Sequence, residues 1–252
     1  MNQKAALISG GATRLGRYFS ETLADAGYDI ALHVNRSRGE AEEVARVVRA
    51  KGRECEIFHC DFLNDDLSDE LSSLVHAAKL RFPGLNLLLN SASTYEPAPI
   101  AATNLAMLQT QFRVNMFTPL LLTRYFAEAV HEGQVINIID NKIAYHQYPY
   151  AAYLLSKKSL ADMTRMAALE FAPRIRVNGI APGVVLPAAT RISEYIEWRI
   201  EGIPVNHQGK PAHLIQALLM LLENTFMTGQ ILFVDGGESI NIEGRHSENY
   251  SA

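Results

Sequence analysis

Tyr153 and Lys157 stand four residues apart in this chain of 252 residues. That spacing places both side chains on one face of a helix, within mutual reach. An ammonium group held beside a phenol favours the phenolate and lowers a pKa that is ordinarily about 10, which suits proton transfer. Because Tyr-x-x-x-Lys is common by chance, its meaning depends on the motifs around it.

Asp140 stands thirteen residues before Tyr153, at the end of an apolar run, Val-Ile-Asn-Ile-Ile. The carboxyl ends of strands are where a doubly wound sheet binds its ligands. An ionised carboxylate accepts hydrogen bonds but cannot donate one. Asp140 is therefore poorly suited to polarising a ketone unless it is protonated, and better suited to accepting from the N–H groups of a heterocycle or passing a proton to a ring nitrogen.

A glycine-rich segment, residues 9–16, follows the first apolar run and reads Ser-Gly-Gly-Ala-Thr-Arg-Leu-Gly. At a turn from strand to helix, freed backbone N–H groups and the helix dipole favour a phosphate. Arg14 stands where a third, central glycine is expected, which places a cation beside the diphosphate. The alternative is a tight turn without a ligand, and the surrounding order of strands and helices disfavours it.

The second apolar run ends in residues 33–37, His-Val-Asn-Arg-Ser, where an NAD site carries an Asp or Glu for the ribose hydroxyl. Arg36 can instead pair with a 2'-phosphate, and Ser37 can donate a hydrogen bond to it. The sequence therefore predicts NADP(H) rather than NAD(H). Glu40 is expected to open the next helix, where its charge suits the helix dipole.

The elements that position these residues follow from hydrophobic periodicity, in which short apolar runs alternate with longer segments of helical spacing. The predicted strands are residues 5–9, 29–35, 54–59, 85–90, 134–139, 175–180 and 230–234. The predicted helices are residues 15–26, 39–51, 67–82, 105–130, 150–171 and 212–223. This order predicts an α/β fold, a Rossmann-type doubly wound parallel sheet of about seven strands flanked by helices.

The domain organisation follows from composition and loop length. The chain is 48% hydrophobic and has no polar gap that could serve as a linker, so residues 1–252 are expected to form a single domain. The interruption before the last helix, residues 184–211, is long enough to be a substrate lid. Residues 238–252 are expected to form a polar C-terminal tail that is mobile or tied down by a partner subunit.

Charge and cysteine content exclude several classes of function. Because 23 Lys and Arg residues face 27 Asp and Glu residues and no basic run occurs, we expect neither a nucleic acid nor a membrane as a partner. The first apolar run is broken by Ser9 and Gly10, far short of a signal peptide, which predicts a cytoplasmic protein. Cys55 and Cys60 lack the spacing of a zinc or disulfide framework, so we expect no metal and two small buried side chains.

Together these residues resemble the short-chain dehydrogenase/reductase family over essentially the whole chain. The matching motifs are the glycine-rich turn, Asp61 after the third strand, Asn90-Ser91-Ala92 after the fourth, Asn115, Tyr153 with Lys157, and Pro182-Gly183 after the sixth. Most of that family has a serine in place of Asp140. Pteridine reductases and the bacterial dihydromonapterin reductases show an aspartate at this spacing, and Arg14, His33 and residues 90–97 support that subgroup. Departures are Ser91 for the usual Asn and Ser9 for the usual Thr.

The resemblance implies further roles. Asn115 would hold a water in the proton path, Lys157 would bind the nicotinamide ribose, and Tyr153 with Asp140 would supply the proton. The substrate contacts implied are Ser93, Tyr95, Asp140, Tyr150 and Tyr153, with the Tyr95 ring stacked on a flat bicycle. The alternative for Tyr95 is packing against the lid. The predicted cofactor contacts are Gly10, Arg14, Leu15, Gly16, His33, Asn35, Arg36, Ser37, Asp61, Phe62, Asn90, Ala92, Ser93, Tyr153, Lys157, Pro182 and Gly183.

The leading functional hypothesis is an NADPH-dependent reductase of a pterin or a related C=N heterocycle. A carbonyl reductase in which Asp140 is protonated or bypassed, and a noncatalytic NADP(H)-binding protein, remain as alternatives. The helices predicted at residues 105–130 and 150–171 carry apolar residues around much of their circumference, more than one sheet face can cover. We therefore expect a homotetramer, or at least a dimer.

Overall fold

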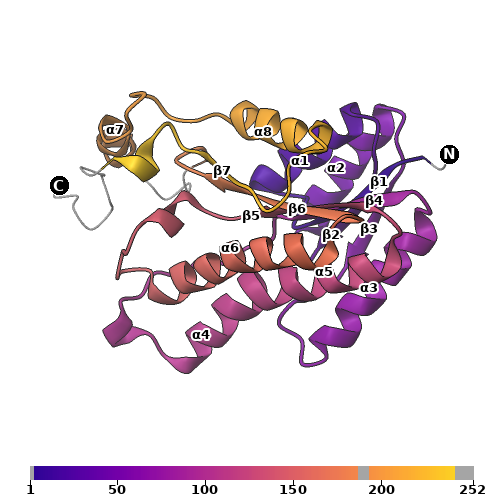
Figure 1. Cartoon of the computed structure of the whole chain (residues 1–252), viewed down its shortest axis with the longest axis horizontal. Coiled ribbons are helices and arrows are strands. Elements are labelled where there is room, and N and C mark those ends of the chain that lie inside the picture. The colour runs from indigo at the N-terminus through magenta and orange to yellow at the C-terminus, as the bar shows by residue number, and fades with distance from the viewer. Residues whose placement is uncertain (1–2, 187–192, 242–252) are drawn as a thin grey trace.

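The structure is a computed structural model that describes residues 3–186 and 193–241. Its centre is a seven-stranded sheet of order β3-β2-β1-β4-β5-β6-β7, in which all neighbours run parallel (Figure 1). The strands are β1 (Ala5–Ser9), β2 (Asp29–Val34), β3 (Cys55–His59), β4 (Leu85–Asn90), β5 (Gly133–Ile138), β6 (Ile175–Pro182) and β7 (Ile231–Val234). The predicted doubly wound α/β fold is confirmed.

The helices follow the predicted order with small shifts at their ends. They are α1 (Arg14–Asp25), α2 (Arg38–Ala50), α3 (Leu67–Arg81), α4 (Leu105–Phe112), α5 (Thr118–Ala129), α6 (Ala151–Phe171), α7 (Ser193–Glu201) and α8 (Pro211–Glu223). Glu40 lies in the first turn of α2, as expected. Helix α7, in the predicted lid, was not predicted.

The prediction of one unbroken α-helix over residues 105–130 is wrong in its middle. Residues Arg113–Phe117 form a π-helical turn between α4 and α5. Pro119 has no N–H to donate to the carbonyl of Asn115, four residues earlier, and the Thr118 hydroxyl donates instead to the carbonyl of Arg113 over 2.8 Å. Because π-turns within helices are frequent at functional sites, this irregularity draws attention to Asn115.

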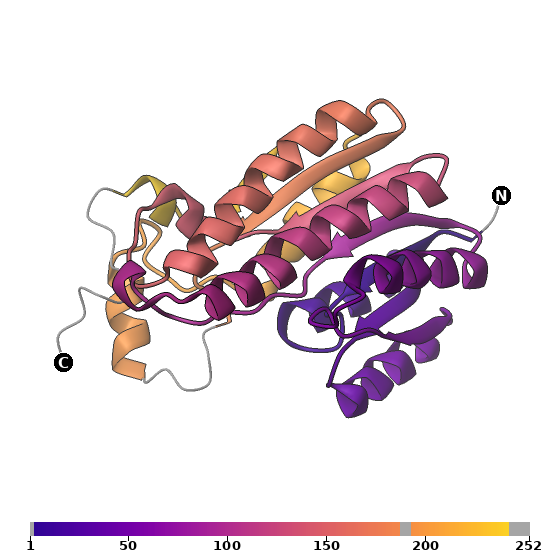
Figure 2. The same cartoon turned by 90° about the horizontal axis from the view of Figure 1, so that it is seen from below.

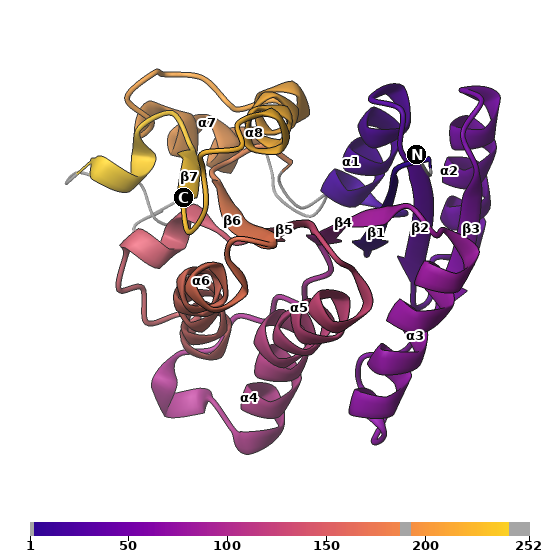
Figure 3. The same cartoon turned by 45° about the vertical axis from the view of Figure 1, so that its right-hand side comes forward.

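Both faces of the sheet are covered by helices (Figures 2 and 3). Ala5 and Leu7 of β1 pack with α3, α5 and α6, whereas Ala6 and Ile8 pack with α1, α2 and α8. A strand buried on both faces has no polar side, which explains why β1 reads as an uninterrupted apolar run. The two apolar layers hold the sheet in place between the helices, and the loops that follow its strands carry the polar residues of the candidate site.

The direction of chain progression reverses between β1 and β4, the neighbours at the centre of the sheet. At such a switch point the loops leaving the carboxyl ends diverge and leave room for a ligand. Figure 1 shows α7 at this end of the sheet. Residues 187–192 of the predicted lid and 242–252 of the predicted tail lie outside the described residues. Within the described ranges, no helix combines the length and apolar character needed to cross a membrane.

Candidate active site

A cleft of about 640 Å³ opens at the carboxyl ends of the central strands. It is lined by predicted site residues from the loops after β1, β4, β5 and β6 and from α6, namely Gly10, Arg14, Leu15, Gly16, Ala92, Ser93, Tyr95, Asp140, Tyr153, Lys157, Pro182 and Gly183. Sequence positions as far apart as 10 and 183 are thus brought to one site. The remaining predicted residues lie behind these or at the edge of the sheet.

Tyr153 and Asp140 face each other across the cleft wall. Asp140 follows β5, and Tyr153 lies in the first turn of α6. The Tyr153 hydroxyl donates to Oδ2 of Asp140 over 2.6 Å, while Oδ1 accepts from the backbone N–H of Lys142 over 2.8 Å. Lys157, one turn further along α6, donates from Nζ to the Ile138 carbonyl over 2.9 Å. The carboxyl group, the phenol and the ammonium therefore form one constellation.

The electrostatics of Tyr153 differ from the sequence expectation. Its pKa is raised well above the ordinary value, first by burial and then by the negative charge and hydrogen bond of Asp140. Burial also lowers the pKa of Lys157 to about 8, opposed by the charge of Asp140. The expected lowering of the Tyr153 pKa by Lys157 is thus wrong for this structure, because helical spacing predicts proximity but not desolvation. Tyr153 is a neutral phenol that carries a transferable proton.

Asn115 lies in the π-helical turn and is fully buried. Its Oδ1 accepts from the backbone N–H of Thr94 over 2.9 Å and from the Ser93 hydroxyl over 3.0 Å. Its Nδ2 donates to the Thr94 carbonyl over 2.9 Å. The side chain therefore fixes the loop after β4, which carries Ser93 and Tyr95 into the cleft. That Asn115 holds a water in the proton path stays a prediction.

Three tyrosines form one wall of the site. The rings of Tyr95 and Tyr150 are stacked with centroids 5.2 Å apart, and Tyr95 meets Tyr153 edge to face at 4.8 Å. Tyr95 is 44% exposed and lines the cleft, whereas Tyr150 is 4% exposed and lies behind it. Such a wall suits a flat aromatic ligand. In this structure Tyr150 supports the Tyr95 ring and does not line the cleft.

The glycine-rich turn is shaped for close approach of a ligand. Gly10 has φ 64°, and a Cβ there would lie 2.9 Å from Cα of Ala92. A Cβ on Gly16 would lie 2.1 Å from the carbonyl oxygen of Gly10. Arg14 has φ 49°, a left-handed conformation that glycine adopts readily and arginine does not. The structure thus retains the backbone shape of a glycine at Arg14, and the Arg14 guanidinium donates to the carbonyl of Leu186.

His33 lies beneath this turn and is 2% exposed. Its Nδ1 accepts from the backbone N–H of Gly10 over 3.2 Å, which leaves Nε2 to donate to the Cys60 carbonyl over 3.0 Å. Its ring stacks on Phe62 with centroids 4.3 Å apart. Burial lowers the pKa of His33 to about 4, so the ring stays neutral and joins the turn to the end of β3.

The residues predicted to contact the 2'-phosphate lie at the carboxyl ends of β2 and β3, outside the lining of the cleft. Asn35 donates to Asp61 over 2.9 Å, and this joins the ends of β2 and β3. Arg36 is exposed, and its guanidinium forms no ion pair with any described residue. Ser37 is the N-cap of α2, where its hydroxyl makes no capping bond. This arrangement offers an anion an unpaired cation, a hydroxyl and a helix N-terminus.

Two motif residues of the sequence stand at strand ends, since Asn90 is the last residue of β4 and Gly183 follows β6. Asn90 donates to Asn137 over 2.8 Å, and its buried Oδ1 has no partner within the described structure. A Cβ on Gly183 would lie 2.7 Å from Asp235, so this glycine permits close packing of the segments after β6 and β7.

The enoyl-(acyl carrier protein) reductase family model, one of the short-chain dehydrogenases/reductases, matches residues 10–239. The chain belongs to the short-chain dehydrogenase/reductase family. It is 30% identical to an uncharacterized oxidoreductase of Mycobacterium tuberculosis over 94% of this chain and 92% of that protein. It is 27% identical to pteridine reductase 1 of Leishmania tarentolae over 93% of this chain and 96% of that protein.

A solved structure extends this likeness to the backbone. The fold is similar to FolM alternative dihydrofolate reductase 1 from Brucella suis, crystallised in complex with NADP, with a TM-score of 0.89. The two share 30% sequence identity, and the match covers 98% of each chain. These comparisons confirm the resemblance inferred from the glycine-rich turn, Asp140, Tyr153 and Lys157.

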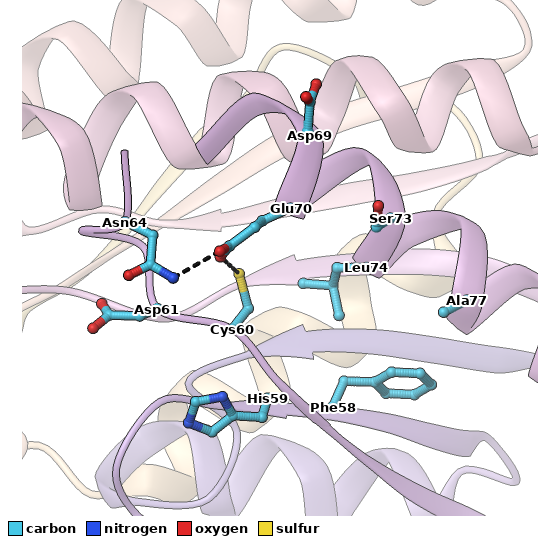
Figure 4. A pocket seen from close by; sticks show the side chains of 10 residues that line it. All are labelled: Phe58, His59, Cys60, Asp61, Asn64, Asp69, Glu70, Ser73, Leu74 and Ala77. Carbon is cyan, nitrogen blue, oxygen red and sulfur yellow. Dashed lines mark hydrogen bonds between the residues drawn. The ribbon is translucent and has the colours of Figure 1, made fainter. Parts of the chain in front are cut away.

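This short-chain dehydrogenase/reductase has a second hollow beside β3 and α3 (Figure 4). In it Glu70 accepts from the Cys60 thiol over 3.4 Å and from the Asn64 amide over 2.7 Å. Burial, aided by Glu70, raises the pKa of Cys60 to about 12, which excludes a reactive thiolate. Cys55 and Cys60 are both free and buried, which confirms the prediction for them.

Sequence reasoning missed several polar residues around the cleft of this short-chain dehydrogenase/reductase. Arg199 of α7 forms an ion pair with Glu238, and their side chains are 6% and 1% exposed. Asn141 donates to the same carboxylate over 2.9 Å. Lys142 also lines the cleft, and its position two residues after Asp140 was the signal available for it. Among the residues the structure describes, no cluster of His, Cys, Asp or Glu could hold a metal ion.

Proposed function

We propose that this chain is an NADPH-dependent oxidoreductase that reduces a pterin, such as a dihydropterin, or a similar C=N heterocycle. The observation that carries the proposal is the 2.6 Å hydrogen bond from Tyr153 to Asp140, at the position where most of the family has serine. A phenol and a carboxyl group together present a proton and an acceptor. A heterocycle with ring N–H groups and a basic nitrogen matches both.

The residues fit NADP(H) at the opposite end of the cleft. The close approaches at Gly10 and Gly16 form a cradle that any Cβ would fill, and Arg36 is an unpaired cation beside the N-terminus of α2. The solved relative from Brucella suis carries NADP, which supports the same assignment. When bound, NADPH would supply a hydride to a carbon of the substrate ring.

The protein's own groups would handle the proton. Burial and Asp140 keep Tyr153 protonated, so its hydroxyl can donate to a ring nitrogen. Asp140 holds that hydroxyl and can accept from a neighbouring N–H of the substrate. Lys157 places a positive charge behind this pair, anchored on the Ile138 carbonyl. The exposed ring of Tyr95 would cover one face of the flat substrate.

The alternatives are less well supported. A ketone needs a donor where this chain places the Asp140 carboxyl, so carbonyl reduction depends on a protonated Asp140 or on Tyr153 alone. A noncatalytic binding protein would have no need of Tyr153, Lys157 and Asn115 in one constellation. The deciding experiment compares NADPH oxidation with a dihydropterin and with a panel of ketones. Turnover of ketones alone would contradict the proposal. Binding of NADPH without turnover of any substrate would favour a noncatalytic NADP(H)-binding protein.

We further propose a single domain of residues 1–252 with a substrate lid at residues 184–211, a tail at residues 238–252 and a cytoplasmic location. The Arg199–Glu238 ion pair supports the lid, since it ties α7 to the start of the tail. The two free cysteines are in keeping with a reducing compartment.

We also propose a homotetramer. On α6, Leu154, Leu160 and Met163 are buried in the protomer, whereas Leu155, Met166 and Leu169 are 51%, 69% and 84% exposed. An apolar stripe of this kind suits a helix packed against a second copy. Light scattering tests this proposal, and the double substitution of Met166 and Leu169 by glutamate should dissociate the assembly. A wild-type monomer at micromolar concentration would contradict it.

A further inference from the structure

Lys142 is a charged residue of the described cleft that the proposed chemistry leaves unused. It lines the cleft and is half-buried, in the short 3-10 helix Asn141–Ala144 that follows Asp140. Its backbone N–H donates to Oδ1 of Asp140 over 2.8 Å. Lys142 is thereby fixed at the substrate end of the site, and not at the end that suits a dinucleotide.

The side chain of Lys142 reaches the tyrosine wall. Its Nζ lies 4.2 Å from the ring centroid of Tyr150 and 5.6 Å from that of Tyr95. Aromatic faces attract a cation and hold it in place. They do not satisfy its N–H donors, which remain available for hydrogen bonds to an anion. The ammonium is therefore positioned beside the ring on which the substrate is proposed to stack.

Charge balance in the cleft singles out the same residue. Lys142 Nζ has no carboxylate within ion-pair distance and no hydrogen-bonded partner among the described residues. The other charged side chains that line the described cleft have partners: Arg14 on Leu186, Lys157 on Ile138, Arg199 on Glu238, and Asp140 on Tyr153. At the substrate end of the described cleft, the two cations Lys142 and Lys157 stand against one carboxylate, Asp140, which leaves one uncompensated positive charge.

We propose that Lys142 determines substrate specificity by binding a carboxylate on the tail of the pterin. The inference rests on the proposed function and narrows its substrate class to pterins whose side chain is acidic. In this proposal, the substituent of a flat ring that lies on Tyr95 runs along the tyrosine wall toward the Lys142 ammonium, which lies 5.6 Å from the Tyr95 centroid. A pterin with an uncharged side chain gains nothing from that charge.

Kinetics with two substrates test the proposal. Dihydrofolate, whose tail ends in a glutamate, is compared with dihydrobiopterin, whose side chain is uncharged. Lys142→Met removes the charge and keeps an unbranched side chain that is one atom shorter. It should raise KM for dihydrofolate about tenfold, with kcat and the KM for dihydrobiopterin unchanged. Lys142→Arg should restore the lower KM. Added salt should raise the dihydrofolate KM of the wild type and leave that of Lys142→Met nearly constant.

Lys4→Met is a matched control, because Lys4 also lies over a tyrosine ring, 4.2 Å from the centroid of Tyr28, and precedes the opposite end of β1. Its kinetics should equal those of the wild type. Equal KM increases for both substrates in Lys142→Met would overturn the proposal and leave Lys142 as a support for Tyr95 and Tyr150.

Calorimetric binding separates this proposal from the proposed function. Folate and biopterin, which probe affinity without turnover, are titrated into the NADP complexes of wild type and Lys142→Met. A selective loss of folate affinity supports the role of Lys142 even if no dihydropterin is reduced, in which case only the proposed function fails. Equal affinities of the two proteins for folate, or no binding of either pterin, overturn the inference.

Discussion

The Tyr153 hydroxyl donates to Oδ2 of Asp140 over 2.6 Å, and this contact raises the pKa of Tyr153 together with burial. The relationship joins the carboxyl end of β5 to the first turn of α6. A proton on the phenol is thus held at the cleft wall by the acceptor beside it. Reduction of a C=N bond consumes one proton, and this pair is placed to deliver it.

Asp140→Ser should nearly abolish reduction of a dihydropterin, because a hydroxyl cannot relay a proton as a carboxyl group does. Loss of a group that takes part in general acid–base transfer lowers the rate by about a hundredfold to ten-thousandfold. The affinity for NADPH should stay close to normal, since Asp140 lies at the substrate end. The measurement is kcat for a dihydropterin beside calorimetric cofactor binding.

Asp140→Asn is the control for this variant, because it keeps the shape and an oxygen to accept from the Lys142 N–H but cannot take up a proton. It should be as slow as Asp140→Ser with the dihydropterin. Weak ketone turnover should rise with serine, which restores the hydroxyl donor common in the family. Unchanged pterin turnover in both variants would show that Asp140 is merely structural.

Arg36→Asp should weaken NADPH binding far more than NADH binding. The exposed Arg36 has no ion pair within the described structure and stands just before α2, whose N-cap is Ser37. A charge-assisted contact is worth about 1.5 to 3 kcal/mol, so we expect a tenfold to hundredfold loss for NADPH. Arg46→Asp, the same charge change at an exposed site within α2, is the control. If calorimetry finds both cofactors equally weakened by Arg36→Asp, Arg36 does not bind the 2'-phosphate.

Much of the fold could be predicted, because each buried strand is a short apolar run and polar residues begin where the strand ends. The predicted ends of β1 and β4 agree with the structure to the residue. The π-helical turn could not be predicted from periodicity, since its apolar spacing resembles that of an α-helix and its cause is the missing N–H of Pro119. Helix α7 was not found because it lies in a segment whose prolines and glycine indicated only a loop.

The site could be predicted where one loop carries it and not where distant segments form it. The glycine-rich turn, Asp140 and Tyr153 each follow a predicted strand or open a predicted helix. The Arg199–Glu238 pair joins residues thirty-nine positions apart and has no local pattern. The raised pKa of Tyr153 depends on its burial by several elements. The four-residue spacing of Tyr153 and Lys157 gives no information about that burial.

Arg14→Gly should leave the free protein at least as stable while weakening NADPH binding about tenfold. Arg14 has φ 49°, and a left-handed conformation costs a residue other than glycine about 1 kcal/mol or more. Glycine relieves that strain but removes a cation from the turn that is expected to hold the diphosphate. Thermal unfolding without cofactor and calorimetry with NADPH measure the two effects. A marked fall in stability together with normal affinity would mean that the Arg14 contact with Leu186 is structural and that no phosphate lies there.

Lys157 should set the alkaline limit of activity. Burial lowers its pKa to about 8, so the ammonium that backs Tyr153 and Asp140 is lost above that pH. The value of kcat/KM for a dihydropterin should therefore be constant below about pH 8 and fall about tenfold per pH unit above it. A profile that stays flat to pH 10 would contradict this role for Lys157.

The same shift makes Lys157 a source of instability. The pKa of Lys157 is 10.5 in the unfolded chain and about 8 in the folded protein. Between these two pH values the unfolded chain binds more protons than the folded protein does. The free energy of unfolding therefore rises with pH over this range. Below pH 8 the penalty is complete, at about 3 kcal/mol, and Lys157→Met removes it but leaves the Ile138 carbonyl without its donor, which costs about 1 kcal/mol. Lys157→Met should therefore be inactive yet about 2 kcal/mol more stable at pH 7, with the advantage shrinking toward pH 10. Urea unfolding of both proteins at the two pH values measures it, and a variant that is less stable than the wild type at pH 7 would show that the buried ammonium is not penalised.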